Sequence, residues 1–377
     1  MTGERGNRLL RSLDRALGIP LVRALGLLRG KNAPPETLRS VGVLCLGCIG
    51  DMVLFSGPLA DLAREHPQAR LTIFCSRANL EAALMVSCAA EVVALPVKNP
   101  IQATALVRRY GPFDTWLDAS QWPRLGALLS FAARAGHTIG FMSPSQHRHH
   151  VYDAVVPHSR ACHELENFRK LFAPLGITGN SIPRLAPLAG AEVGLPGGRL
   201  PQSPYAVLHM FPGGFRSHMK EWPQASWRQV TLALVDRGLE VLLSGGPADH
   251  EGNEALVRNA GSERVRNLAG VRVGPTALLL ERAAVVVSVN TGIMHLAAAV
   301  GAPLVSLTGP VNAERWGAVA RLGRLVSLSS PRSCAPCLHL GFEYACEDNA
   351  CMREIPVAVV LAAVDRLLAR PDAPEAP

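Results

Sequence analysis

Long apolar runs are missing from this 377-residue chain. No stretch reaches the roughly 18 consecutive apolar residues that a transmembrane helix needs. The nearest candidate, residues 41–59, is interrupted by Asp51 and contains four glycines. The basic amino terminus lacks an uninterrupted apolar core and a clean cleavage site, which argues against a signal peptide. We therefore expect a cytoplasmic protein, either free or at a membrane surface.

Charged residues are also scarce, at 18% against 48% apolar residues, which is typical of globular proteins and not of disordered ones. Aromatic residues make up 5% of the chain, and no basic stripe with interleaved aromatic side chains occurs. We therefore expect no nucleic-acid partner, despite a net charge of +8. The length suffices for two ordinary domains.

Positive charge is concentrated near the amino terminus. Residues 1–40 contain eight Lys or Arg and three acidic residues, with leucines between them at roughly helical spacing. Such a basic amphipathic segment can lie on an anionic membrane surface. It can equally form a helix that packs on the body of the protein, and the sequence leaves both interpretations open.

From residue 41 onward, short apolar runs alternate with segments of helical periodicity, which is the pattern of a parallel sheet covered by helices. Five Pro and five Gly in residues 177–204 interrupt this pattern before it restarts. We predict an α/β protein with an amino-terminal segment (1–40), a first domain (41–176), a linker (177–204), a second domain (205–330) and a Cys-rich segment with a helix (331–377). The predicted strands are 42–46, 70–75, 91–95, 115–118, 137–140, 205–209, 240–243, 265–267, 285–289 and 304–307.

The loops that follow strands are the candidate sites, because ligands of open α/β sheets bind beyond the carboxyl ends of the strands. The first such loop is Gly47-Cys48-Ile49-Gly50-Asp51. Its glycines let the backbone approach a ligand, and Asp51 is either a helix cap or a catalytic carboxylate. The loop is not a dinucleotide fingerprint, because the chain has no Gly-x-Gly-x-x-Gly.

Four Gly-bearing loops follow strands of the second half, and this predicts a nucleotide site there. One leads to Lys220, a compact cation suited to phosphate, and another holds Asp249 and Glu251, which can accept hydrogen bonds from a ribose or begin a helix. A third combines a tight turn with the start of a helix, so its N–H groups and helix dipole favour phosphate. It consists of Asn290, Thr291, Gly292, Ile293, Met294 and His295.

Four of the nine cysteines cluster late in the chain, at Cys334, Cys337, Cys346 and Cys351. In a cytosolic protein such spacing suggests a structural Zn²⁺. A thiol-rich loop or a redox-labile disulfide pair fits the spacing equally well.

Six motifs, taken together and in order, resemble glycosyltransferase family 9, the ADP-heptose:lipopolysaccharide heptosyltransferases and their relatives. They are Gly47–Asp51, Lys220–Pro223, Gly245-Gly246-Pro247, Asn267-Leu268-Ala269-Gly270, Asn290–His295 and Gly309-Pro310. The resemblance runs from about residue 41 to the end and includes the segment that closes on Cys351-Met352.

The resemblance implies a GT-B fold, with two Rossmann-like domains facing across a cleft. It also implies inverting transfer of a heptose from an ADP-activated donor to a hydroxyl of a lipopolysaccharide core or related cell-envelope glycan. If the acceptor is lipid-linked or a polysaccharide, we expect the protein to act at the cytoplasmic face of the inner membrane. Residues 1–40 would then make peripheral contact with that membrane. Because no Asp-x-Asp occurs, we expect no obligatory metal cofactor, apart from the possible structural zinc.

The same resemblance assigns roles to single residues. Asp51 would be the general base, with Gly50 on the acceptor side. Lys220 and the turn at 290–295 would bind the donor diphosphate, although the early helix position of His295 also fits simple packing. Asp249 or Glu251 would contact the ribose, and Ala269 and Gly270 would line the same side of the nucleotide.

One residue departs from the family pattern. Many members have Asp where this chain has Asn290, which keeps the turn geometry but removes a charge beside the diphosphate. This change disfavours a divalent ion there and leaves the donor sugar open. Two other hypotheses remain: a nucleotide-sugar epimerase of similar architecture, and a non-catalytic scaffold.

Overall fold

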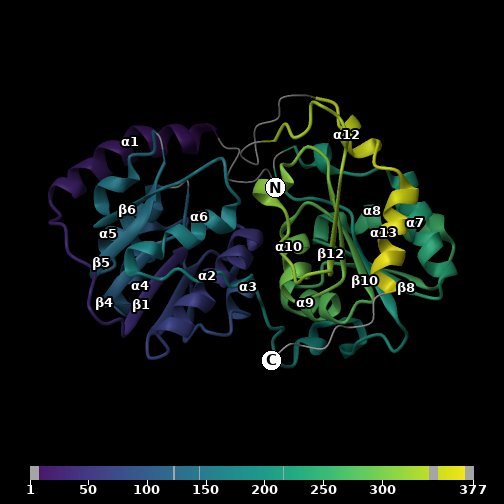
Figure 1. Ribbon diagram of the computed structural model, residues 1–377, viewed down its shortest axis with the longest axis horizontal. Coiled ribbons are helices and arrows are strands. Elements are labelled where there is room, and N and C mark those ends of the chain that lie inside the picture. Colours follow the sequence, from purple (N-terminus) through teal and green to yellow (C-terminus); the bar gives the residue numbers. More distant parts are fainter. Residues whose placement is uncertain (1–7, 122–123, 144, 215, 339–346, 370–377) are drawn as a thin grey trace. The chain divides into compact units, whose positions relative to one another are not determined.

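The computed structural model describes all residues except 1–7, 122–123, 144, 215, 339–346 and 370–377. The chain forms two compact units, Asn7–Arg184 and a second that begins at Leu185, and each is built on its own six-stranded parallel sheet (Figure 1). The boundary lies within residues 177–204. Both units have the α/β architecture that the alternating pattern predicts.

The strands of the first unit are β1 (Ser40–Cys45), β2 (Arg70–Cys75), β3 (Glu91–Ala94), β4 (Phe113–Asp118), β5 (Ala135–Met142) and β6 (Ala154–Pro157), in the order β3-β2-β1-β4-β5-β6. The helices are α1 (Arg8–Leu27), α2 (Ile49–Glu65), α3 (Leu80–Leu84), α4 (Pro100–Tyr110), α5 (Arg124–Ala132) and α6 (Glu164–Lys170), with the 3-10 helices η2 (Arg148–Val151) and η3 (Ala173–Leu175). Helices α2, α3 and α6 cover one face of the sheet and α4 and α5 the other, with α1 against α5 and η2 (Figure 1).

Aromatic side chains fill the core under α4 and α5. Phe74, Phe113 and Trp116 have ring centroids 5.0–5.9 Å apart. Gly42 on the neighbouring strand makes room for the indole, because a Cβ there would lie 2.5 Å from Cε3 of Trp116. Strands covered on both faces in this way read as continuous apolar runs, which is why the sequence predicts them.

The strands of the second unit are β7 (Tyr205–His209), β8 (Glu240–Gly245), β9 (Val265–Ala269), β10 (Val285–Val289), β11 (Leu304–Thr308) and β12 (Leu325–Ser329), in the order β12-β11-β10-β7-β8-β9. The α-helices are α7 (Gln224–Asp236), α8 (His250–Ala260), α9 (Val273–Glu281), α10 (Gly292–Ala299), α11 (Ala313–Trp316), α12 (Ala350–Arg353) and α13 (Val357–Leu368). The 3-10 helices are η4 (Ala191–Gly194), η5 (Pro196–Gly198), η6 (Ser217–Lys220) and η7 (Pro247–Asp249). Helices α7, α8 and α13 cover one face and α9 and α10 the other (Figure 1).

Two strands, β6 and β12, are absent from the sequence prediction. Both are short edge strands: β6 is a four-residue run that ends in a proline, and β12, which is only half-buried, contains two serines. In the part of the chain that the structure describes, no helix combines the length and the hydropathy needed to cross a membrane.

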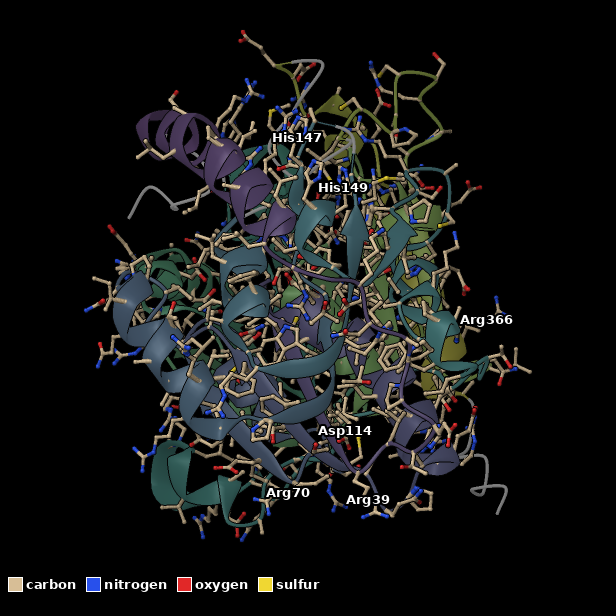
Figure 2. All side chains as sticks on the ribbon, turned by 90° about the vertical axis from the view of Figure 1, so that its left-hand side faces the viewer. Arg39, Arg70, Asp114, His147, His149 and Arg366 are labelled. Atoms are coloured by element: carbon tan, nitrogen blue, oxygen red, sulfur yellow. The ribbon has the colours of Figure 1, made fainter. Side chains whose placement is uncertain are left out.

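Figure 2 distinguishes the two edges of the first sheet. Arg39, Arg70 and Asp114 lie at its amino end, and His147 and His149 lie at the opposite, carboxyl end beside α1. At the amino end, the Asp114 carboxylate accepts hydrogen bonds from the N–H groups of Arg39 and Ser40, both at 2.8 Å. These bonds fix the start of β1 against β4, so the residues after both strands emerge together at the carboxyl edge.

A buried ionic network closes the carboxyl end of β4. Oδ2 of Asp118 accepts hydrogen bonds from Nη2 of Arg148 at 2.5 Å, from the Tyr152 hydroxyl at 2.7 Å and from the Ser130 hydroxyl at 3.2 Å. Oδ1 accepts the N–H of Ser120 at 2.8 Å. Burial opposes the charge on Arg148, but the adjacent Asp118 carboxylate outweighs it and raises the pKa of the guanidinium. The Arg148 guanidinium is therefore charged, and both side chains of the pair are buried.

This network predicts that Arg148→Met strongly destabilises the first unit. Removing one partner of a buried ion pair costs about 3–5 kcal/mol, because the other charge stays buried without compensation. The matched control is Arg70→Met, which breaks an exposed pair with Glu91 (3.2 Å) and should cost about 0–1 kcal/mol. Urea unfolding followed by circular dichroism measures both free energies, and similar losses in the two variants would contradict the prediction.

Candidate functional site

The strand order places a reversal point in each sheet. β1 lies beside β4 in the first unit and β7 beside β10 in the second, so the chain leaves these neighbouring strands toward opposite faces. Open parallel sheets bind ligands beyond the carboxyl ends of such strands. Asp51 follows β1, Lys220 follows β7 and Asn290 follows β10, so each predicted key residue lies at the reversal point of its own sheet.

Asp51 lies in the first turn of α2 and acts as a helix cap. Its Oδ2 accepts the N–H of Cys48 at 2.6 Å, while Gly50 is buried beneath it. Gly47 is required for this conformation, because a Cβ at that position would lie 2.2 Å from Oδ2. The Asp51 side chain is partly exposed, and the positive end of the helix dipole favours its charged form. A partly exposed carboxylate that accepts this bond can serve both as a cap and as a base.

The sequence between residues 143 and 163 is rich in His and Arg, and three of these side chains have partners within the protein. Arg148 is buried on Asp118, and Nε2 of His158 pairs with Glu164 at 2.9 Å. His163 caps α6 by accepting the N–H of Leu165. Each of these three side chains therefore has a bonding partner within the protein.

Lys220 links the two central loops of the second unit. It ends the 3-10 helix η6, and its Nζ lies 3.4 Å from the carbonyl oxygens of both Gly213 and Asn290. Gly213 follows β7 and Asn290 follows β10, so the ammonium group lies at the reversal point of the sheet. At the end of β7, burial lowers the pKa of His209 to about 4, so this histidine is neutral at pH 7.

Thr291 caps the helix that begins in the turn at 290–295, and its side chain already accepts some of the N–H groups of the turn. The Thr291 hydroxyl accepts hydrogen bonds from the N–H groups of Ile293 (3.1 Å) and Met294 (3.4 Å). The side chains of Met294 and His295 are buried in α10. Two N–H groups of the predicted phosphate-binding turn, those of Ile293 and Met294, are therefore already bonded within the protein.

Asn290 makes a bond that a carboxylate could not make. Its Nδ2 donates to the Trp316 carbonyl at 3.1 Å, and its own N–H donates to Leu307 on the neighbouring strand β11. The amide orientation is fixed chemically, because only NH₂ can face a carbonyl oxygen. The side chain of Asn290 thus joins the β10 loop to α11, while the backbone carbonyl oxygen of Asn290 faces Lys220.

The loop after β8 repeats the geometry of the loop after β1. Oδ2 of Asp249 accepts the N–H of Gly246 at 2.7 Å, and a Cβ on Gly245 would lie 2.9 Å from the same oxygen. Burial raises the pKa of Asp249, and the bond from Gly246 opposes the shift. Glu251 is exposed in the first turn of α8.

The loop after β9 is tied to the same place. The N–H of Gly270 donates to the Gly245 carbonyl at 2.9 Å, and Gly270 has φ +92°, which favours glycine. The N–H of Ala269 donates to Oδ1 of Asn267. The predicted ribose-side residues of β8 and β9 are therefore neighbours.

The sequence analysis assigned no role to Glu221, which lies next to Lys220. Burial and the nearby Asp249 carboxylate raise the pKa of Glu221.

The Cys-rich segment supports the central loops. The N–H groups of Cys337 and Leu338 both donate to the Pro310 carbonyl, at 3.0 and 2.8 Å. Nδ2 of Asn349 donates to the carbonyl oxygens of His218 (3.1 Å) and Glu221 (3.2 Å), on either side of Lys220. The sequence offered no signal for Asn349, because its partners are 131 and 128 residues away.

The structure describes three of the four clustered cysteines. Cys334 is exposed, Cys337 and Cys351 are buried, and Cys346 lies outside the described residues. Within those described ranges, no three or more His, Cys, Asp or Glu side chains are placed to hold a metal ion.

Two doubly wound parallel sheets with glycine-rich loops at their reversal points define the chain as a two-domain protein of the GT-B class, as predicted. The family model described as glycosyltransferase family 9 (heptosyltransferase) matches residues 112–346. The chain belongs to glycosyltransferase family 9, which confirms the resemblance seen in the motifs.

Known relatives agree with this assignment. Lipopolysaccharide heptosyltransferase 1 of Pseudomonas aeruginosa is 34% identical over 191 residues, which is 50% of each chain, so the chain spans about half the length of this curated relative. The solved structure of E. coli ADP-heptose lipopolysaccharide heptosyltransferase II has a TM-score of 0.71 at 18% identity, over 87% of this chain and 98% of that one. A family 9 glycosyltransferase from Veillonella parvula has a TM-score of 0.73 at 18% identity, over 89% and 99%. At these identities the two structures establish the fold.

The bond from Asn290 to Trp316 predicts a pH-dependent defect in Asn290→Asp. A carboxylate would face the Trp316 carbonyl and could not donate, so we expect a loss of about 1–3 kcal/mol of stability at pH 7. The protonated form can donate, which raises the pKa of the introduced carboxyl in the folded state. The deficit relative to the natural chain should therefore shrink as pH falls through that raised pKa.

Thermal unfolding from pH 4 to pH 8 measures this effect, with the natural chain compared at each pH. Asn290→Ala is the control, because it removes the donor but introduces no titrating group, so its deficit should not vary with pH. Equal unfolding temperatures of the Asp variant and the natural chain at pH 7 would show that the donated bond does not matter.

Proposed function

We propose that this protein is an inverting glycosyltransferase that moves heptose from ADP-heptose to a hydroxyl of a lipopolysaccharide core or a related cell-envelope glycan. Its family membership supports the reaction class, and the names of its relatives support the sugar and the nucleotide. The observation that carries the proposal is the position of Lys220. Its ammonium group lies at the reversal point of the second sheet, between the loops where a diphosphate would bind.

The proposed chemistry is a single displacement at the anomeric carbon. The acceptor oxygen forms a bond to that carbon, the bond to the diphosphate oxygen breaks, and the electron pair leaves with ADP, so the configuration inverts. Asp51 takes the proton of the acceptor hydroxyl, as an ionised carboxylate can at neutral pH. Lys220 and the N–H groups of Thr291 and Gly292 stabilise the charge that develops on the leaving diphosphate.

The remaining residues bind the nucleotide. We assign the ribose hydroxyls to Asp249 or Glu251, and the neighbouring side of the nucleoside to Ala269 and Gly270, which the bond from Gly270 to Gly245 keeps beside the β8 loop. His295 contributes packing at the start of α10, consistent with its burial. Asn290 holds the turn without adding a negative charge beside the diphosphate.

The acceptor assignment includes a location. A lipopolysaccharide acceptor is lipid-linked while it is assembled, so we propose that the protein works at the cytoplasmic face of the inner membrane. We further propose that residues 1–40, with their excess of basic residues, make peripheral contact with that membrane.

Release of ADP from a panel of ADP-sugars, and of UDP from a panel of UDP-sugars, tests the reaction with and without lipid acceptors. ADP-heptose with acceptor should release ADP, and Asp51→Asn should lower kcat by about 10²–10⁴-fold, because a general base contributes that much. An amide oxygen can still accept the N–H of Cys48, so the helix cap and the fold should survive.

Asp249→Asn is the matched control, because it alters the same type of cap in the other unit. It should raise the KM for the donor and change kcat little. ADP release that is unaffected by Asp51→Asn would refute the assignment of the base. Interconversion of the sugar nucleotide without release of ADP would indicate an epimerase, and no reaction with any donor would indicate a scaffold.

We also propose that Cys334, Cys337, Cys346 and Cys351 hold a structural Zn²⁺. Four thiolates are the donor set of many structural zinc sites. Two of them lie at one turn: Cys337 bonds to Pro310, and Sγ of Cys351 is 3.2 Å from the position of a Cβ on Gly309.

Elemental analysis of the purified protein for zinc and iron tests the metal site. One zinc per chain is expected, with loss of the metal and a lower unfolding temperature in Cys334→Ser/Cys337→Ser. Metal-free protein whose unfolding temperature is unchanged by a chelator would show that the cysteines are structural thiols.

A further inference from the structure

Helix α1 presents two apolar faces, and only one of them is covered. The inner face contacts α5 and η2 of the first unit. Val22 is fully buried there with Ala127, Val151 and Tyr152. The backbone also comes close, because a Cβ on Gly26 would lie 2.6 Å from the His150 carbonyl oxygen. The helix is therefore part of the folded body.

Ion pairs fix α1 in this orientation. Asp14 pairs with the buried Arg124, and just after the helix Nη2 of Arg29 lies 3.1 Å from Oδ2 of Asp153. Because these bonds fix the rotation of the helix about its axis, its opposite face is fixed toward solvent. The sequence offered a packed helix and a surface-binding helix as alternatives, and α1 meets the requirements of both.

The outer face of α1 is apolar and exposed. Leu17, Leu21, Leu27 and Leu28 are 68%, 46%, 90% and 78% exposed. They are four of the eleven large hydrophobic residues that are exposed among the described residues, so such residues are concentrated here. Residues 17, 21 and 24 follow the helical repeat i, i+4, i+7, Ala24 is also exposed, and Leu28 directly follows the last residue of the helix.

Basic residues border this face. Arg15, Arg23 and Lys31 are exposed, and Nη2 of Arg23 lies 3.2 Å from Nδ1 of His147 at the carboxyl edge of the sheet. Asp14 is the one acidic residue of α1, and Arg124 neutralises it. An apolar stripe with a positive border suits the interface of an anionic bilayer, where leucines enter the acyl boundary and arginines meet lipid phosphates.

We propose that this outer face of α1, the stripe of Leu17, Leu21, Leu27 and Leu28 with Arg15 and Arg23, docks the protein on an anionic lipid bilayer. The inference deepens the proposed function, because it rests on an acceptor that is embedded in that bilayer. A second copy of the chain fits this face less well. Self-pairing would bring the same positive border of two chains together, and like charges repel.

Vesicle sedimentation of the full chain tests the proposal, with vesicles of one-third phosphatidylglycerol in phosphatidylcholine and vesicles of pure phosphatidylcholine. The natural chain should bind the anionic vesicles and bind the neutral ones weakly. Leu17→Gln/Leu28→Gln should lower the anionic partition coefficient at least about tenfold, because two leucines no longer enter the bilayer. Arg15→Gln/Arg23→Gln should lower anionic binding and its salt dependence, and leave neutral binding unchanged.

Leu84→Gln/Ile101→Gln is the matched control, since it removes two exposed hydrophobic residues (44% and 85%) from the same unit. It should bind vesicles like the natural chain. Equal vesicle binding by Leu17→Gln/Leu28→Gln and Leu84→Gln/Ile101→Gln, or equal binding of the natural chain to anionic and neutral vesicles, would overturn the proposal. So would a dimer in sedimentation velocity that Leu17→Gln/Leu28→Gln abolishes while vesicles bind neither protein.

The assay also separates this inference from the proposed function. Vesicle binding needs neither donor nor acceptor, so it can succeed when no sugar is transferred. Conversely, Leu17→Gln/Leu28→Gln should transfer sugar normally to a delipidated, water-soluble acceptor and lose transfer only to an acceptor embedded in vesicles. Equal loss on both acceptors would mean that α1 acts on the fold and not on docking.

Discussion

Parallel strand pairing is the constraint on which the rest of this structure depends. All strands of a parallel sheet end at one edge, and the reversal of strand order places two loops from distant parts of the chain beside each other there. In the second unit this brings Lys220 to the carbonyl oxygen of Asn290, 70 residues further along the chain. The cation is thus placed by topology more than by its local sequence.

Two of these loops contain the same short hydrogen-bonded turn. In each, an aspartate accepts the N–H of the residue three positions earlier, and a glycine four positions earlier provides the space that the carboxylate occupies. Asp51 accepts this bond after β1, and Asp249 accepts it after β8. Local geometry therefore does not separate the proposed base from the proposed ribose contact. Their places in the sheets do, because β1 borders the reversal point of its sheet and β8 lies one strand away from that of the other.

The sequence predicts features that depend on neighbouring residues, and it misses those that depend on distant ones. Strands buried on both faces produce long apolar runs, whereas the edge strand β6 is only four residues long and the edge strand β12 contains two serines. The motifs of the site are contiguous, so each lies at a strand end as expected. The partner of Arg148 is 30 residues away, and no local pattern distinguishes this buried arginine from a solvated one. The bond from Asn290 to Trp316 shows why a donor occupies a position where an acid is common, and that too is a tertiary contact.

Hydrogen bonds connect the Cys-rich segment directly to the loops of the proposed donor site. Asn349, just before α12, holds the carbonyl oxygens of His218 and Glu221, so it holds the short turn that carries Lys220. Earlier in the segment, Cys337 and Leu338 bond to Pro310 after β11. A segment attached to the loops of both β7 and β11 restrains them from outside the sheet. The described part of this segment therefore restrains the turn that carries Lys220 and the loop that contains Pro310, so changes in the segment should alter the position of the cation that we propose to bind the diphosphate.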